Sequence, residues 1–143
     1  MYDLHHDLLD ALKATPETLT GLLTGISDAQ ARSARGGDED WSVVEVVCHL
    51  RDAEEISLQR LEAMRDQEYP LIIGYDQEAL ARDRNYKEAD LQSALSGFIA
   101  FRQRLIATLA VLAPEQWERS GQHNEMGRIT IFSHAIHKAS HDA

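Results

Sequence analysis

The sequence predicts an all-α protein, a four-helix bundle formed by a single domain over residues 1–143. Leucine and alanine are abundant, and the chain contains only three prolines. Apolar residues recur every three or four positions in four main segments, which is the period that places them on one face of a helix. Long connections join the second, third and fourth segments, and no internal repeat is present. This arrangement is typical of a bundle rather than a solenoid.

The first segment, Asp3–Ala14, places leucines at helical spacing. Thr15 and Pro16 then resemble the start of a new helix. Threonine is a common N-cap, and proline is favoured at the first helical position, where its missing N–H costs nothing. We therefore expect two helices in succession. The polar, glycine-containing segment 33–40 is predicted to be a loop.

The second main helix should begin with a capping box, in which Ser42 accepts a hydrogen bond from the backbone of Glu45 and the Glu45 side chain reaches back. It should end before Tyr69–Pro70, because the residue ahead of a proline avoids helical angles. His49 falls on the flank of the apolar stripe of this helix, from where it can still point into a bundle. The residues predicted to face inward are Val43, Val46, Val47, Leu50, Ser57, Leu58, Leu61 and Met64.

Short elements should join the second main helix to the third. Residues 71–75 are predicted to be an apolar connection and residues 76–84 a modest helix with a solvated, charged face. Asp90 can cap the third main helix. Arg102 interrupts the apolar face of that helix and has two interpretations: a salt-bridged or snorkelling arginine, or a contact for an anion or substrate.

A loop containing His123 is predicted over residues 120–127, and Thr130 can cap the last main helix. This last helix carries His134, His137 and His141, which are three and four residues apart. That spacing places three imidazoles on one helix face.

Neutral imidazole is a good ligand for divalent zinc, nickel or iron. If the helix that carries His49 packs against the last helix, the histidines of the two helices predict a metal site. Three protein ligands leave a coordination position open, which is more typical of catalysis or substrate binding than of a structural site. Asp52 or Glu54 can serve as an orienting partner or general base, although each one alone is more typical of an exposed surface.

The charge balance argues against two classes of partner. The formal net charge is -10, from 24 acidic and 14 basic residues, and no segment concentrates lysine or arginine. Nucleic acids and anionic membranes both require a basic surface, so we expect neither. Cys48 is the single cysteine, which excludes an intramolecular disulfide. Without a signal peptide or a long apolar run, the chain is expected to be soluble and cytoplasmic.

Several short motifs, in order, resemble those of the DinB-like family of small metal-binding four-helix bundles. The matching residues, over nearly the whole chain, are Trp41, Ser42, Glu45, His49, Leu50, Asp52, Glu54, Arg60, Gly74, Tyr75, Asp76, Phe98, Phe101, Arg102, Gly127, Ile129, Thr130, His141 and Asp142.

The resemblance implies an up-down-down-up bundle that holds a divalent metal with three histidines, one from the second main helix and an H-x-x-x-H pair from the last. His49 matches the first ligand, and His141 matches the first member of the pair. The second member would fall at position 145, beyond the 143 residues of this chain. Either the last helix continues past residue 143, or His137 and His141 form the pair.

The resemblance also implies an activity. Family members with assigned functions are metal-dependent transferases that use low-molecular-weight thiols such as bacillithiol or mycothiol. We therefore expect a small-molecule substrate, a thiol co-substrate whose pKa the metal lowers, and a homodimer. Arg102 or Arg60 would bind an anionic group, and His123 would line the mouth of the site. The alternatives are a non-catalytic metal- or ligand-binding bundle in a stress response, and a helical dimerisation domain with incidental histidines.

Overall fold

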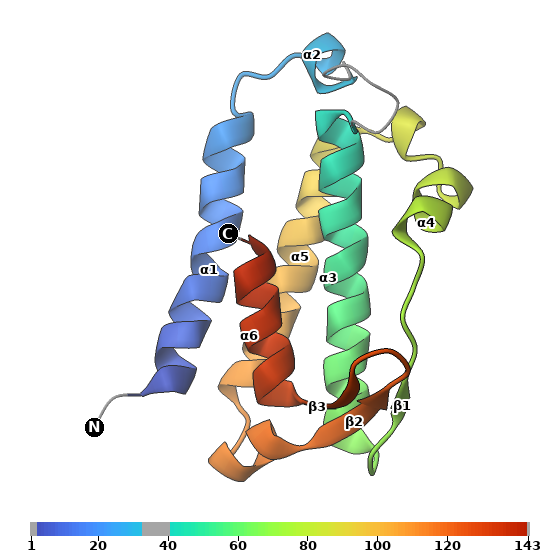
Figure 1. Ribbon diagram of the computed structural model, residues 1–143. Helices are drawn as coiled ribbons and strands as arrows, with labels where there is room; N and C mark the ends of the chain where they lie inside the picture. Colours follow the sequence, from blue (N-terminus) through green and yellow to red (C-terminus); the bar gives the residue numbers. More distant parts are fainter. Residues whose placement is uncertain (1–2, 33–40, 143) are drawn as a thin grey trace.

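The computed structural model describes residues 3–32 and 41–142, so the loop predicted over residues 33–40 lies outside the described residues. Four long helices pack side by side (Figure 1): α1 (Leu4–Leu23), α3 (Val43–Asp66), α5 (Leu91–Ala110) and α6 (Ile131–Asp142). Followed along the chain in Figure 1, α1 runs upward, α3 and α5 run downward, and α6 runs upward. The predicted all-α, up-down-down-up four-helix bundle is confirmed.

This topology explains the long connection after α3. Because α3 and α5 run in the same direction, the chain between them must return along the whole length of the bundle. It does so through strand β1 (Leu71–Ile72), helix α4 (Gln77–Asp83) and a 3-10 helix (Tyr86–Glu88). Asp76 caps α4 and Asp90 caps α5, where the Asp90 carboxylate accepts a hydrogen bond from the Ser93 amide at 2.9 Å.

Helix α1 continues through Pro16, so the prediction of two helices in succession is wrong. Proline lacks the N–H that would bond to the Leu12 carbonyl one turn earlier. That carbonyl instead accepts a hydrogen bond from Nη1 of Arg102 at 2.9 Å. A side chain from α5 therefore satisfies the carbonyl that the proline leaves without its helical partner. After α1 comes α2 (Asp28–Arg32), a short helix that was not predicted.

The predicted capping box at the start of α3 is confirmed. Oγ of Ser42 accepts from the Glu45 amide at 3.4 Å, and Oε1 of Glu45 accepts from the Ser42 amide at 3.3 Å. The helix ends at Asp66, ahead of Pro70 as expected. The prediction that Val46 faces inward is wrong, since it is 42% exposed and Val44 is buried in its place.

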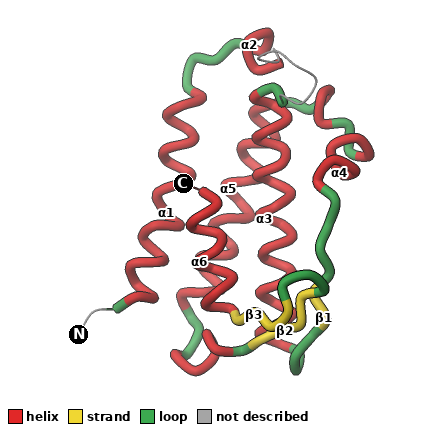
Figure 2. The backbone as a smooth tube through the Cα atoms, in the orientation of Figure 1, coloured by secondary structure: helices red, strands yellow, loops and turns green. Residues whose placement is uncertain are grey.

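The buried residues form two apolar clusters along the bundle. One cluster joins α1, α3, α5 and α6 and includes Leu12, Leu61, Leu105, Trp117 and Ile131. The other lies where α3 and α5 meet the 3-10 helix and includes Val47, Cys48, Tyr86, Ala94 and Leu95. Helices α3 and α5 run along each other within this core (Figure 2).

A small sheet closes one end of the bundle, where the sequence predicts only an apolar connection and a loop (Figure 2). Strands β2 (Ser120–His123) and β3 (Gly127–Thr130) form an antiparallel hairpin, and β1 pairs with β2 in parallel. A 3-10 helix (Pro114–Glu118) leads from α5 into this hairpin. Gly121 lies at a close approach of the chain, because a Cβ atom would lie 3.0 Å from both the Pro70 carbonyl and the Ile72 side chain.

Thr130 caps α6, as predicted, by accepting a hydrogen bond from the Ser133 amide at 3.0 Å. The hairpin thereby sets the point from which α6 rises between α1 and α3. Over the described residues, none of the helices is both long enough and apolar enough to cross a membrane.

Candidate metal centre and adjoining cavity

His49 of α3 and His141 of α6 lie next to each other, although they are far apart in the sequence. Their ring centroids are 5.8 Å apart, with an interplanar angle of 63°. Trp41 contacts the His49 ring edge-on at a centroid distance of 5.4 Å and helps to fix its orientation. Two imidazoles at this separation can both reach one ion at the usual distance of about 2.0–2.1 Å. The fold thus brings together the two histidines that the resemblance assigns to a metal.

The surroundings of His49 favour the form of imidazole that binds metals. Burial lowers the pKa of His49 below its ordinary value, and the nearby His141 and Lys138 lower it further, whereas Asp52 acts in the opposite direction. A neutral imidazole keeps the lone pair that a metal ion requires. The pair therefore fits a divalent transition metal in its chemistry as well as in its spacing.

The other two histidines of α6 differ in exposure. His137 is exposed, whereas His134 is 8% exposed and its Nε2 atom has no hydrogen-bond partner among the described residues. Burial, followed by Lys138 and Arg60, lowers the pKa of His134 to about 4. Over the described part of the chain, no group of three or more His, Cys, Asp or Glu side chains is arranged to hold a metal ion. A third protein ligand, His137 included, stays a prediction.

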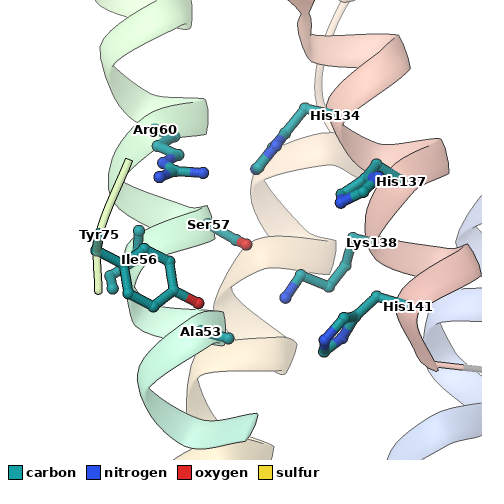
Figure 3. A pocket seen from close by; sticks show the side chains of 9 residues that line it. All are labelled: Ala53, Ile56, Ser57, Arg60, Tyr75, His134, His137, Lys138 and His141. Atoms are coloured by element: carbon teal, nitrogen blue, oxygen red, sulfur yellow. The ribbon is translucent and has the colours of Figure 1, made fainter. Parts of the chain in front are cut away.

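A cavity of about 140 Å³ adjoins the histidine pair between α3 and α6 (Figure 3). His141 belongs both to the pair and to the wall of this cavity. Arg60 and Tyr75 face the histidines of α6 across it. The residues that line it are Ala53, Ile56, Ser57, Arg60, Tyr75, His134, His137, Lys138 and His141.

Glu54 organises the charged groups behind the cavity. Its carboxylate accepts hydrogen bonds from Nε of Arg102 at 2.5 Å and from Nη2 at 3.0 Å, and Nζ of Lys138 lies 3.4 Å away. All three side chains are buried. The expectation that Glu54 is typical of an exposed surface is therefore wrong. Of the two interpretations of Arg102, the structure shows the salt bridge, and Arg102 is not among the residues that line the cavity.

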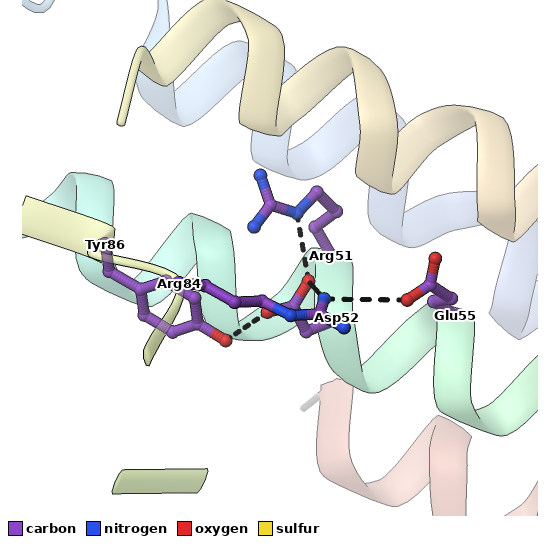
Figure 4. A network of polar contacts seen from close by, with 5 residues as sticks. All are labelled: Arg51, Asp52, Glu55, Arg84 and Tyr86. Carbon is purple, nitrogen blue, oxygen red and sulfur yellow. Dashed lines mark hydrogen bonds and ion pairs between the residues drawn. The ribbon is translucent and has the colours of Figure 1, made fainter. Parts of the chain in front are cut away.

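Asp52 has a different role, which Figure 4 shows. It is buried, so the expectation of an exposed side chain is wrong here too. Its carboxylate accepts hydrogen bonds from Arg51 at 3.1 Å, from Arg84 at 2.7 Å and from the hydroxyl of Tyr86. Burial and the Asp52 carboxylate both raise the pKa of Tyr86. The bonds from Arg84 and Tyr86 hold the segment between α3 and α5 against α3.

His123 lies in strand β2 and is buried, rather than in an open loop. Its Nδ1 atom accepts hydrogen bonds from the amides of Glu125 and Met126 at 3.0 and 3.1 Å. These bonds shape the turn between β2 and β3. His123 is not among the residues that line the cavity.

Sequence reasoning did not place Lys138 or Tyr75 in a cavity wall, although Tyr75 is among the residues that carry the family resemblance. Lys138 is four residues after His134 and three before His141, so the same helical spacing places it on their face. Its charge gave no reason to expect burial, because the partner, Glu54, belongs to another helix. Tyr75 lies in the connection after α3, and only the path of that connection brings it to the cavity.

Comparison with known proteins places the chain in a family. The model of the DinB superfamily matches residues 11–143. This chain belongs to the DinB superfamily. The chain is also 27% identical over 128 residues to "putative metal-dependent hydrolase YfiT" of Bacillus subtilis (strain 168), covering 90% of this chain and 71% of that protein. It is 28% identical over 127 residues to "putative metal-dependent hydrolase OB0782" of Oceanobacillus iheyensis, covering 88% and 72%.

Solved structures share the fold of this DinB protein. YfiT of Bacillus subtilis, described as having an unusual four-helix bundle topology, superposes with a TM-score of 0.84 at 24% identity, covering 99% of this chain and 84% of that one. The four-helix bundle protein TT2238 superposes with a TM-score of 0.66 at 18% identity, covering 96% and 94%.

Proposed function

We propose that this member of the DinB superfamily is a metal-dependent enzyme that acts on a small molecule and holds a divalent transition metal with His49 and His141. The observation that carries the proposal is the 5.8 Å separation of the two imidazole rings, which come from different helices. The lowered pKa of His49 supports it, because a neutral imidazole is the ligating form. Both relatives are named as putative metal-dependent hydrolases, and these names support the proposal independently of the geometry.

For the reaction itself, we propose transfer of a low-molecular-weight thiol, which the family resemblance favours. Hydrolysis is the second candidate, which the names of the relatives favour. A bound zinc-type ion supplies the chemistry for either reaction, since it lowers the pKa of a coordinated thiol or water. The residues of this chain would bind and orient the substrate in the cavity beside His141, with Lys138 held in place by Glu54.

The first test is the metal content per chain, measured by elemental analysis of wild type, His49→Ala, His141→Ala and His6→Ala. His6 is an exposed histidine of α1 and serves as the matched control. We expect close to one metal per chain in wild type and in the control, and loss of the metal in the other two variants. Equal metal content in all four proteins, or none in any, would contradict the proposed ligands.

The spectrum of the cobalt-substituted protein separates the reactions. Coordination of an added thiol would produce an intense sulfur-to-cobalt charge-transfer band, and thiol transfer to an electrophile would then be assayed. An unchanged spectrum at millimolar thiol, together with ester or amide cleavage that depends on the metal, would favour hydrolysis. A metal-bound protein with neither response would favour the non-catalytic binding bundle. We also propose that the protein is a homodimer, which sedimentation velocity would test.

A further inference from the structure

Two cationic side chains, Arg60 and Lys138, line the cavity between α3 and α6. The Arg60 side chain is half-buried, and its Nη2 atom donates to the Ile73 carbonyl at 3.0 Å. The guanidinium carbon lies 5.6 Å from the centre of the Tyr75 ring, which fixes the plane of the group. Arg60 takes part in none of the ion pairs among the described residues, but burial lowers its pKa and the nearby Tyr75 and Glu125 raise it. An arginine remains charged in such surroundings.

Lys138 is held by the Glu54 carboxylate, which lies behind the cavity and also pairs with Arg102. Among the described residues, no aspartate or glutamate lines the cavity. The chain as a whole is strongly acidic, with a formal net charge of -10. The described lining is therefore more cationic than the composition of the chain.

Three further polar groups point to a ligand in the same space. Nε2 of His134 is buried and makes no hydrogen bond of normal geometry among the described residues, although the Ser57 backbone lies close enough to raise the pKa of this imidazole. The imidazole faces Arg60 (Figure 3). The hydroxyls of Tyr75 and Ser57 also reach the cavity wall. A buried polar atom without a partner is costly, so Nε2 of His134 can bond a water molecule or a ligand that enters the cavity.

We propose that this cavity binds the carboxylate of a small organic acid, with Arg60 as the principal anchor and Tyr75 and His134 as hydrogen-bonding partners. The planar guanidinium matches the two oxygens of a carboxylate. The cavity of about 140 Å³ has room for several water molecules or for a short carboxylic acid.

The cavity lies beside the proposed metal centre. His141 lines the cavity and is also one of the two proposed metal ligands. An acid held by Arg60 would therefore extend toward the histidine pair. This consequence, that the substrate of the enzyme is an organic acid, rests on the proposed function, whereas carboxylate binding itself does not.

The test is a titration of the metal-free protein with sodium acetate, followed by amide shifts in ¹⁵N NMR spectra at constant ionic strength. We expect saturable shifts in the segments that line the cavity, residues 53–60 and 134–141. Arg60→Met should weaken acetate binding roughly tenfold or more, since a hydrogen bond to a charged group is lost. Arg104→Met removes the same charge from an exposed position on α5 and should leave the affinity within about twofold of wild type.

Tyr75→Phe provides a second variant in case the loss of Arg60 disturbs folding. It removes only a hydroxyl and should weaken acetate binding roughly three- to tenfold. Absence of saturable binding to the metal-free wild type, or equal affinity in wild type, Arg60→Met and Tyr75→Phe, would overturn the proposal. Inorganic phosphate that bound more tightly than acetate would overturn the assignment to a carboxylate.

The metal-free titration also separates this proposal from the proposed function. If acetate bound only after zinc was added, and Arg60→Met had no effect, acetate would be bound at the metal. The cavity proposal would then be overturned, whereas the proposed metal centre would be supported. Acetate that bound to a protein unable to retain any metal would support the cavity, although the proposed function would have failed.

Discussion

Arg102 shows how much one buried side chain can depend on residues from other helices. Its guanidinium donates to Glu54 of α3 and to the Leu12 carbonyl that Pro16 leaves without a helical partner in α1. The side chain is fully buried, at 0% exposure. A buried ion pair adds little stability compared with apolar residues in the same place. Removal of one partner is nevertheless strongly destabilising, because it leaves the other charge buried and uncompensated.

Arg102→Met should therefore lower the free energy of unfolding by about 3–5 kcal/mol, measured by urea denaturation. Arg104→Met, at an exposed position on the same helix, should change it by less than about 0.5 kcal/mol. Adding Pro16→Ala to Arg102→Met should restore about 1 kcal/mol, because the alanine supplies a backbone N–H that can donate to the Leu12 carbonyl in place of the lost guanidinium. A small effect of Arg102→Met would mean that Lys138 alone can balance Glu54.

His134 makes stability depend on pH. In the folded protein the pKa of His134 is about 4, against 6.5 as the ordinary value. Above pH 6.5 the residue is neutral in both states and has no effect. As the pH falls from 6.5 to 4, the unfolded chain takes up a proton that the folded protein does not, and the unfolded state is favoured.

The free energy of unfolding should thus fall by up to about 3 kcal/mol over this pH range because of His134. Urea denaturation at several pH values should show a shallower fall for His134→Leu than for wild type. His6→Gln, which alters an exposed histidine, should keep the steep fall. The same pH dependence in all three proteins would contradict the assignment.

At the scale of elements, two glycines have opposite roles. Gly21 lies near the end of α1, and a Cβ atom there would meet nothing within 4 Å. Gly121 lies in β2, where the sheet approaches Pro70 and Met64 so closely that a Cβ atom would lie 3.0 Å from a backbone oxygen. The absence of a side chain at this position lets the hairpin pack closely on the end of α3.

Gly21→Ala should raise the free energy of unfolding by about 0.5–1 kcal/mol, since alanine is the better helix former. Gly121→Ala should lower it by about 1–3 kcal/mol, as overpacking does in a filled interior. Thermal unfolding of wild type and the two variants measures whether each substitution raises or lowers stability. A neutral Gly121→Ala would show that the hairpin can move away from α3 at little cost.

At the scale of the molecule, the proposed metal would link α3 to α6 through His49 and His141. A ligand that binds only the folded state stabilises it by about 2.7 kcal/mol at one hundred times its dissociation constant. Zinc should therefore raise the melting temperature of metal-free wild type, and a chelator should reverse the increase. His49→Ala should show no such increase. An equal increase in the variant would mean that zinc binds elsewhere.

The sequence alone determined the features that depend on neighbouring residues. The helical periods, the capping box at Ser42, the caps at Asp90 and Thr130, and the all-α class all follow from contacts within one or two turns. The order of the motifs also carried the family resemblance, and the DinB superfamily is confirmed. The histidine-bearing face of α6 was predictable because helical spacing is regular.

Only the tertiary structure decided the features that join distant residues. Pro16 lies within a continuous helix because Arg102 satisfies the carbonyl it leaves open, and the three-stranded sheet forms because β1 meets a hairpin about fifty positions later. Glu54 and Lys138 are buried because each compensates the charge of a residue on another helix. Local sequence determines which helix a residue joins and which face it occupies, but the free energy of burying a charge depends on partners that only the packed bundle brings together.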